Sequence, residues 1–187
     1  DLEHFKRGNS FTVVICAYNA GKYIEKCIDS VINQLSDIDE LLIINDGSTD
    51  NTAALLKKYA SADKLRILNN ETNCGLAHSR NTGYLNASGS VVFYIDADTS
   101  LPDEMLDRID SLFSEYTDYA AVTGRGIETV NSGIYNECRA LFYQQTQGLK
   151  IIYNPQFLSG LCMAIKKNTL IEIGGFNLFY RTHAEDV

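Results

Sequence analysis

The sequence predicts an α/β fold in which a mostly parallel central sheet is flanked by helices. Two observations support this prediction. Short β-branched and aliphatic runs alternate with stretches of helical periodicity over the first 125 residues, and polar clusters follow three of these runs. Such alternation is typical of right-handed βαβ units, whose parallel strands end at the same rim of the sheet. Because ligands bind at that rim, we expect the polar clusters to form the functional site.

The predicted strands are short apolar runs separated by turn-forming residues. They cover residues 11–16, 41–44, 65–68, 91–95 and 120–123. The segments between them carry apolar residues at helical spacing. They predict helices over residues 24–35, around 55–59 and over 75–87. Strands and helices therefore alternate throughout this half of the chain.

A further helix is expected to begin at Ser100. Serine is a preferred N-cap, Pro102 falls in the first turn, and Asp103 stands at the capping-box position. From residue 126 onward the alternation is less regular. That part of the sequence is compatible with two helical stretches and a loop over residues 155–160.

Composition excludes several classes of protein. A chain of 187 residues suits about one domain, and 45% hydrophobic with 21% charged residues is ordinary globular composition. The formal net charge of −8 argues against nucleic-acid binding. The apolar runs are only a few residues long, so no transmembrane helix is expected. Five cysteines without a C-x-x-C motif favour neither a disulfide framework nor a zinc site, and they indicate a reducing, cytoplasmic compartment.

Acidic residues are the strongest candidates for chemistry. Asp96 and Asp98 follow a buried strand and could bind Mg²⁺ or Mn²⁺ together, or could simply begin a turn. Asp46 follows another strand and could accept a hydrogen bond from a ligand N–H, or could cap the next helix. Glu185 and Asp186 could supply a general base for an alcohol nucleophile, although an isolated pair of this kind is usually a solvated surface feature.

Several blocks of sequence stand in a recognisable order. They lie at residues 12–19 (TVVICAYN), 28–34, 45–52 (NDGSTDNT), 73–83 (NCGLAHSRNTG), 96–98 (DAD), 174–176 (GGF) and 185–186 (ED). In order and spacing they resemble the family 2 inverting glycosyltransferases of the GT-A fold, which is Rossmann-like. The sequence departs from the family pattern at Asn45, where Asp is usual, at Cys16, where Pro is common, and at Ser79, where Ala is usual.

The resemblance implies a role for each matching residue. Asp98 would bind Mn²⁺ or Mg²⁺ that bridges a diphosphate. Asp186 would be the catalytic base, with Glu185 beside it. Asp46 would hydrogen-bond the nucleotide base. The full set of implied nucleotide-sugar-binding residues is Ala17, Tyr18, Asn19, Asp46, Gly75, Arg80, Asp96 and Ala97.

The implied activity is metal-dependent, inverting transfer of a hexosyl or N-acetylhexosaminyl group. The donor would be a nucleotide-sugar, with a UDP-sugar as the first choice. The acceptor would be a hydroxyl group of a saccharide or lipid-linked molecule in cell-surface polysaccharide or glycoconjugate synthesis. The expected location is the cytoplasm, with peripheral association at the inner face of the membrane left open.

The resemblance also implies one GT-A domain over residues 1–187. Residues 1–125 would form its nucleotide-sugar-binding half. Residues 126–187 would form an acceptor-side half that is cut short at the C-terminus. Two alternatives remain at this point: a nucleotide-sugar-binding module without catalytic activity, and a nucleotidyltransferase.

Overall fold

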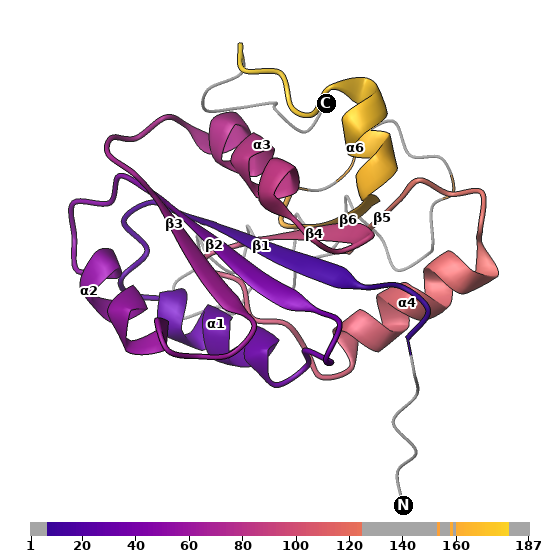
Figure 1. Cartoon of the computed structure of the whole chain (residues 1–187), viewed down its shortest axis with the longest axis horizontal. Coiled ribbons are helices and arrows are strands. Elements are labelled where there is room, and N and C mark those ends of the chain that lie inside the picture. The colour runs from indigo at the N-terminus through magenta and orange to yellow at the C-terminus, as the bar shows by residue number, and fades with distance from the viewer. Residues whose placement is uncertain (1–6, 125–152, 154–157, 159, 180–187) are drawn as a thin grey trace, which may run out of the picture.

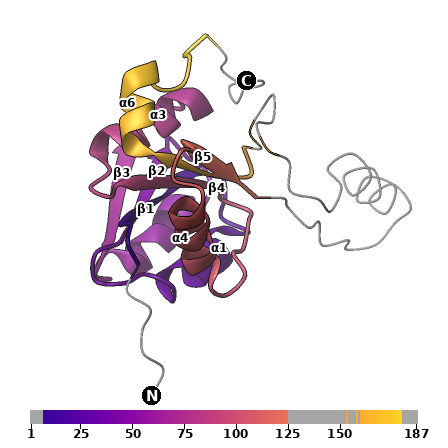
Figure 2. The same cartoon turned by 90° about the vertical axis from the view of Figure 1, so that its right-hand side faces the viewer.

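The computed structural model describes residues 7–124, 153, 158 and 160–179. The strands are β1 (Phe11–Ala17), β2 (Glu40–Asp46), β3 (Leu65–Asn70), β4 (Val91–Asp96), β5 (Ala121–Thr123) and β6 (Cys162–Lys166). The helices are α1 (Ile24–Ile32), α2 (Thr52–Leu56), the short 3₁₀ helix η1 (Lys57–Tyr59), α3 (Leu76–Asn86), α4 (Met105–Glu115) and α6 (Lys167–Ile173). Helices α1, α2 and α4 cover one face of the sheet, and α3 and α6 cover the other (Figures 1 and 2).

Four neighbouring strands form the predicted parallel sheet. The strand order is β3-β2-β1-β4-β6-β5, and the pairs β3·β2, β2·β1 and β1·β4 are all parallel. Both faces of β1, β2 and β4 are buried, which explains their apolar sequences, whereas the edge strand β3 is only partly buried. Since parallel strands share a direction, β1, β2 and β4 bring their carboxyl ends to one rim. The predicted strands of this half and its helices over residues 24–35, 55–59 and 75–87 are confirmed, with ends that differ by a few residues.

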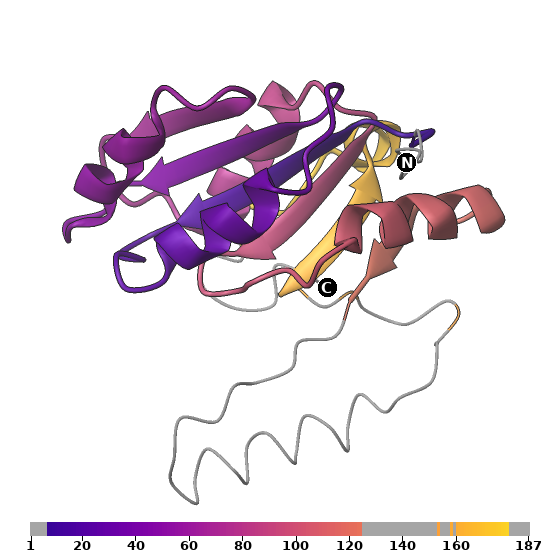
Figure 3. The same ribbon diagram turned by 90° about the horizontal axis from the view of Figure 1, so that it is seen from below.

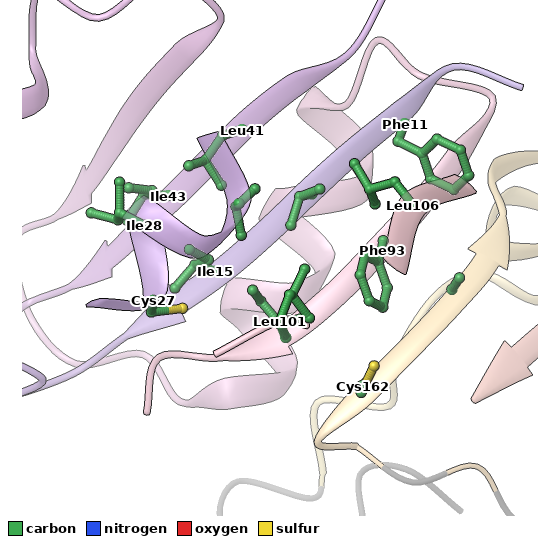
Figure 4. Packing of buried hydrophobic residues seen from close by; sticks show 14 of the residues in the cluster. Phe11, Ile15, Cys27, Ile28, Leu41, Ile43, Phe93, Leu101, Leu106 and Cys162 are labelled. Carbon is green, nitrogen blue, oxygen red and sulfur yellow. The ribbon is translucent and has the colours of Figure 1, made fainter. Parts of the chain in front are cut away.

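Alternate side chains of these strands enter two separate cores. Ile15, Ile43 and Phe93 pack with Ile28 of α1 and Leu106 of α4 in the larger core (Figure 4). The next residues along each strand point to the opposite face and pack beneath α3 and α6. This alternation decides which polar residue at a strand end faces which layer of helices.

Strand β6 was not expected from the sequence. It pairs antiparallel with β4 on one side and with β5 on the other, so that β5 does not neighbour β4 (Figure 3). A five-residue apolar run carries little information about its own conformation. Its partner β4 lies far away in the sequence, and the strand becomes evident only from that non-local pairing.

Helix α4 begins later than Ser100, and the predicted N-cap is wrong. The helix starts at Met105, after Glu104 in the left-handed region with φ 60°. Its first N–H groups are capped by a side chain from the turn after α1: Gln34 Oε1 accepts hydrogen bonds from Met105 N (2.9 Å) and Leu106 N (3.4 Å). The Gln34 side chain replaces the predicted N-cap Ser100, because the first N–H groups of a helix need an acceptor and Gln34 Oε1 already supplies one.

The described part of the chain contains no helix that is both long and apolar enough to span a membrane.

One buried hydroxyl on α3 leads to a stability prediction. Ser79 is fully buried, and its Oγ has no hydrogen-bond partner among the described residues. Replacing Ser79 with alanine removes a desolvated polar group and improves helix propensity, so the free energy of unfolding should rise by about 1 kcal/mol. Urea denaturation followed by circular dichroism measures the change.

A matched control for Ser79→Ala is Ser111→Ala on α4. The Ser111 hydroxyl is exposed and donates to Asp107 O at 2.8 Å. Its removal should change the free energy of unfolding by less than about 0.5 kcal/mol. A lower free energy of unfolding for Ser79→Ala would show that the buried hydroxyl is satisfied in the folded protein.

Candidate functional site

Charged side chains converge at the carboxyl rim on the α3 side of the sheet. The β1–β4 register places Cys16 opposite Asp96, and Asp46 ends the strand on the other side of β1. Burial raises the pKa of the Cys16 thiol to about 12; the nearby Arg80 cation lowers it, whereas Asp96 and Asp46 raise it further. A single thiol is therefore within electrostatic reach of three charged groups from α3, β4 and β2.

The turn after β1 is fastened to the loop after β2 by Asn19. This residue has φ 51°, in the left-handed region that asparagine tolerates. Asn19 Oδ1 accepts hydrogen bonds from Thr49 N (2.8 Å) and Asp50 N (3.2 Å), and its own N–H donates to Ser48 Oγ at 3.1 Å. The Asn19 side chain is thus used within the protein. The neighbouring Tyr18 is 50% exposed.

Asp46 anchors the loop that leads into α3. It is 4% exposed. Its Oδ1 accepts from Asn70 Nδ2 (2.6 Å) and Cys74 N (2.9 Å), and its Oδ2 accepts from Gly75 N (2.9 Å). Gly75 has φ 94°, which glycine adopts without strain. The structure therefore gives Asp46 and Gly75 a clear loop-forming role, and a direct contact of Asp46 with a nucleotide base stays a prediction.

Arg80 lies behind the rim and not on it. The residue is 2% exposed, and its Nη2 donates to Gly160 O at 3.1 Å. The same nitrogen is 3.9 Å from Asp96 Oδ1. Helix α3 can lie this close to the sheet because a Cβ on Gly83 would be only 2.6 Å from Val14 Cγ1. A buried cation needs a compensating partner, and Asp96 supplies the negative charge.

Asp96 and Asp98 are both accessible to a ligand. The Asp96 side chain is 35% exposed, Ala97 is half-buried, and Asp98 is exposed. Burial raises the pKa of the Cys27 thiol to about 12, and the charges of Asp98 and Asp96 raise it further. Both carboxylates therefore lie within electrostatic reach of one thiol, which indicates that they share one end of the sheet.

These two carboxylates fit a hard divalent cation. Carboxylate oxygens suit Mg²⁺ and Mn²⁺, which commonly take only one or two protein carboxylates and fill other positions with phosphate or water. The described residues contain no cluster of three His, Cys, Asp or Glu side chains that could hold a metal by themselves. Asp96 and Asp98 are thus oxygen donors of the type that such an ion takes.

The structure brings most predicted site residues to this rim. They are Ala17, Tyr18, Asn19, Asp46, Gly75, Asp96, Ala97 and Asp98, whereas Arg80 lies buried behind the rim. The predicted base Asp186 and its neighbour Glu185 lie outside the described residues. The expectations for residues 126–152 also fall outside them.

Two residues close to Arg80 were missed by sequence reasoning. Asn81 Nδ2 donates to Phe176 O, and Phe176 N donates to Asn81 Oδ1, both at 2.8 Å. The signal was present, since both residues belong to blocks that matched in order, but neither block by itself indicates a contact between them. They join α3 to the segment that follows α6.

The fold and this rim define an α/β protein whose ligand site lies at the carboxyl ends of parallel strands. The particular family follows from sequence comparison, because residues 12–174 match the family model described as Glycosyl transferase family 2. The chain belongs to this family and has the GT-A fold.

Two relatives illustrate the range of the family. An uncharacterized glycosyltransferase of Haemophilus influenzae is 33% identical over 167 residues, which are 86% of this chain and 50% of the relative. Poly-beta-1,6-N-acetyl-D-glucosamine synthase of Staphylococcus epidermidis is 28% identical over 174 residues, 93% of this chain and 40% of that protein. The chain therefore spans half or less of the length of these curated relatives.

Solved structures share the fold. S. aureus TarS 1–349 in complex with UDP has a TM-score of 0.71 and 22% identity, and the match covers 95% of this chain and 52% of that one. The mannosyltransferase PcManGT from Pyrobaculum calidifontis, in complex with GDP-Man and Mn²⁺, has a TM-score of 0.69 and 24% identity, with 93% and 49% covered.

Proposed function

We propose that this glycosyltransferase moves a sugar, with inversion at the anomeric carbon, from a UDP-sugar to a hydroxyl group of a saccharide or lipid-linked acceptor. The observation that carries the proposal is the pair of accessible carboxylates, Asp96 and Asp98, at the carboxyl rim of the parallel sheet. Carboxylates alone would repel a diphosphate. A divalent cation that lies between the carboxylates and the diphosphate would remove this repulsion.

Individual residues have distinct tasks in this proposal. The exposed ring of Tyr18 stacks on the nucleotide base, and Asp96 faces the ribose and sugar. Asp98 holds Mn²⁺ or Mg²⁺, which when bound neutralises charge on the departing diphosphate. Asp186 removes the proton from the acceptor hydroxyl. The new C–O bond then forms opposite the breaking one, and UDP leaves with the bonding electrons.

A lone base is enough for this reaction. Direct displacement inverts the anomeric centre in one step, so no carboxylate nucleophile is needed to form a covalent sugar intermediate. The S. epidermidis polysaccharide synthase among the relatives supports a saccharide acceptor. The UDP complex of TarS supports UDP, and the GDP-Man complex of PcManGT makes GDP the competing nucleotide to test.

Nucleotide binding tests the proposal directly. UDP with Mn²⁺ should raise the melting temperature of the chain, because a ligand that binds only the native state stabilises it by about 2.7 kcal/mol at 100 times Kd. For a protein of this size that is a shift of about 5–10 °C. Differential scanning fluorimetry measures it, with UDP plus EDTA and GDP plus Mn²⁺ as the comparison samples. The absence of a shift with both nucleoside diphosphates would end the proposal.

A further inference from the structure

A reciprocal pair of hydrogen bonds fixes Phe176 to α3. Asn81 and Phe176 are 95 residues apart in sequence, yet the Asn81 amide donates to and accepts from the Phe176 backbone at 2.8 Å each way. Gly175, with φ 76°, makes this approach feasible, because a Cβ there would be 2.4 Å from Asn81 Oδ1. The chain is therefore held in one register against the helix, and this places the aromatic ring that follows.

The Phe176 ring contacts both Tyr94 and the Arg80 guanidinium. It meets the Tyr94 ring edge to face, with centroids 5.3 Å apart and an interplanar angle of 86°. Arg80 Cζ is 5.4 Å from the Phe176 centroid. The Tyr94 hydroxyl donates to Arg80 O at 3.0 Å, so that β4 holds the backbone of the same arginine. The guanidinium is restricted to one orientation by the Phe176 ring, by the hydrogen bond from Tyr94 to the Arg80 backbone and by the Gly160 carbonyl.

The orientation matters because of what lies on the other side of Arg80. The Arg80 side chain is 3% exposed, whereas the side chain of its partner Asp96, with Oδ1 3.9 Å from Arg80 Nη2, is 35% exposed at the rim. A buried guanidinium that cannot move sets the position of the carboxylate it attracts. A chain of contacts therefore links Asn81, Phe176 and Arg80. It ends at Asp96, which is accessible to a ligand.

We propose that Asn81 and Phe176 are positioning residues, which through the buried Arg80 hold the Asp96 carboxylate in place for the bound nucleotide. This inference rests on the proposed function, since it assumes that Asp96 faces the ligand. It gives Arg80 an indirect part in binding. It also explains why two blocks so distant in sequence belong together: they form the back wall of the site.

The test is a double-mutant cycle on UDP binding with Mn²⁺, measured by isothermal titration calorimetry. Phe176→Leu keeps an apolar side chain but removes the ring, and should weaken UDP binding about tenfold, as is typical when the support of a ligand-holding carboxylate is lost. In an Asp96→Asn background, where the attraction to Arg80 is already gone, the same change should cost no more than about twofold. A merely structural role would give the same loss in both backgrounds.

A matched control is Phe113→Leu. Phe113 is 3% exposed, and Lys166 Nζ lies over its ring at 5.6 Å, so this change also removes a buried ring with a cation on its face, on the opposite side of the sheet. It should lower the unfolding midpoint in urea and leave the UDP affinity unchanged. Asn81→Asp is a second variant that keeps the ring but removes the donor to Phe176 O, and should weaken UDP binding in the same direction.

The possible failures are distinguishable. Equal losses for Phe176→Leu in both backgrounds, or unchanged affinity in both Phe176→Leu and Asn81→Asp, would overturn the positioning role while leaving nucleotide binding intact. A wild-type chain that binds neither UDP nor GDP would remove the proposed function, and the positioning role with it.

Discussion

Replacing Asp98 with alanine should abolish the part of UDP binding that depends on Mn²⁺. The carboxylate is exposed at the end of β4, and no cluster of metal-ligating side chains in the described part of the chain could substitute for it. Losing one member of a charge-assisted contact costs about 2–5 kcal/mol, which is at least a 30-fold loss of affinity. Calorimetric titration of UDP with and without Mn²⁺ measures the loss.

Asp103→Ala is the control for Asp98→Ala, because it removes an exposed carboxylate from the same connection between β4 and α4. It should leave the affinity for UDP with Mn²⁺ unchanged. Treating the wild type with EDTA should lower its affinity to that of Asp98→Ala, and EDTA should have no further effect on the variant. If Asp98→Ala keeps its full response to Mn²⁺, Asp98 is not a metal ligand.

Replacing Asp186 with asparagine should stop transfer without loss of donor binding. Asparagine has nearly the same shape as aspartate but cannot take a proton from the acceptor hydroxyl. General-base catalysis contributes about 10²–10⁴-fold, and turnover should fall by that factor. The rate is measured as acceptor-dependent UDP release from the UDP-sugar that gives the largest thermal shift, and donor binding by titration of the same variant.

Glu185→Gln is the matched control for the base. It alters the adjacent carboxylate by the same chemical change and should reduce turnover far less than Asp186→Asn does. The opposite result, with full turnover in Asp186→Asn and loss in Glu185→Gln, would transfer the role of base to Glu185. Retained turnover in both variants would exclude this pair from catalysis.

Much of the nucleotide-binding half could be predicted because its signals are local. The β-branched runs that became β1, β2 and β4 are buried on both faces, and burial on both faces makes a strand visible as an apolar run. Once those strands are parallel, geometry alone puts Asp46 and Asp96 at one rim. The tasks of the two residues were harder to foresee, because hydrogen-bond partners such as Asn70 and Cys74 come from other segments.

The start of α4 shows where local reasoning fails. Ser100, Pro102 and Asp103 have the residue types of a helix start, yet the helix begins at Met105 because Gln34, 71 residues earlier, accepts its first N–H. An N-cap residue is a local preference worth about 1 kcal/mol, and a hydrogen bond to a side chain from a distant segment is enough to outweigh it.

By itself, the sequence determined the parallel α/β core, its rim of carboxylates and membership of a family, because side-chain periodicity and block order are properties of the chain alone. Only the tertiary structure decided that β6 separates β5 from β4, that Arg80 is buried behind Asp96, and that Asn81 holds Phe176. Those features depend on contacts between distant segments. Such contacts form, and stabilise the protein, only when the whole domain packs.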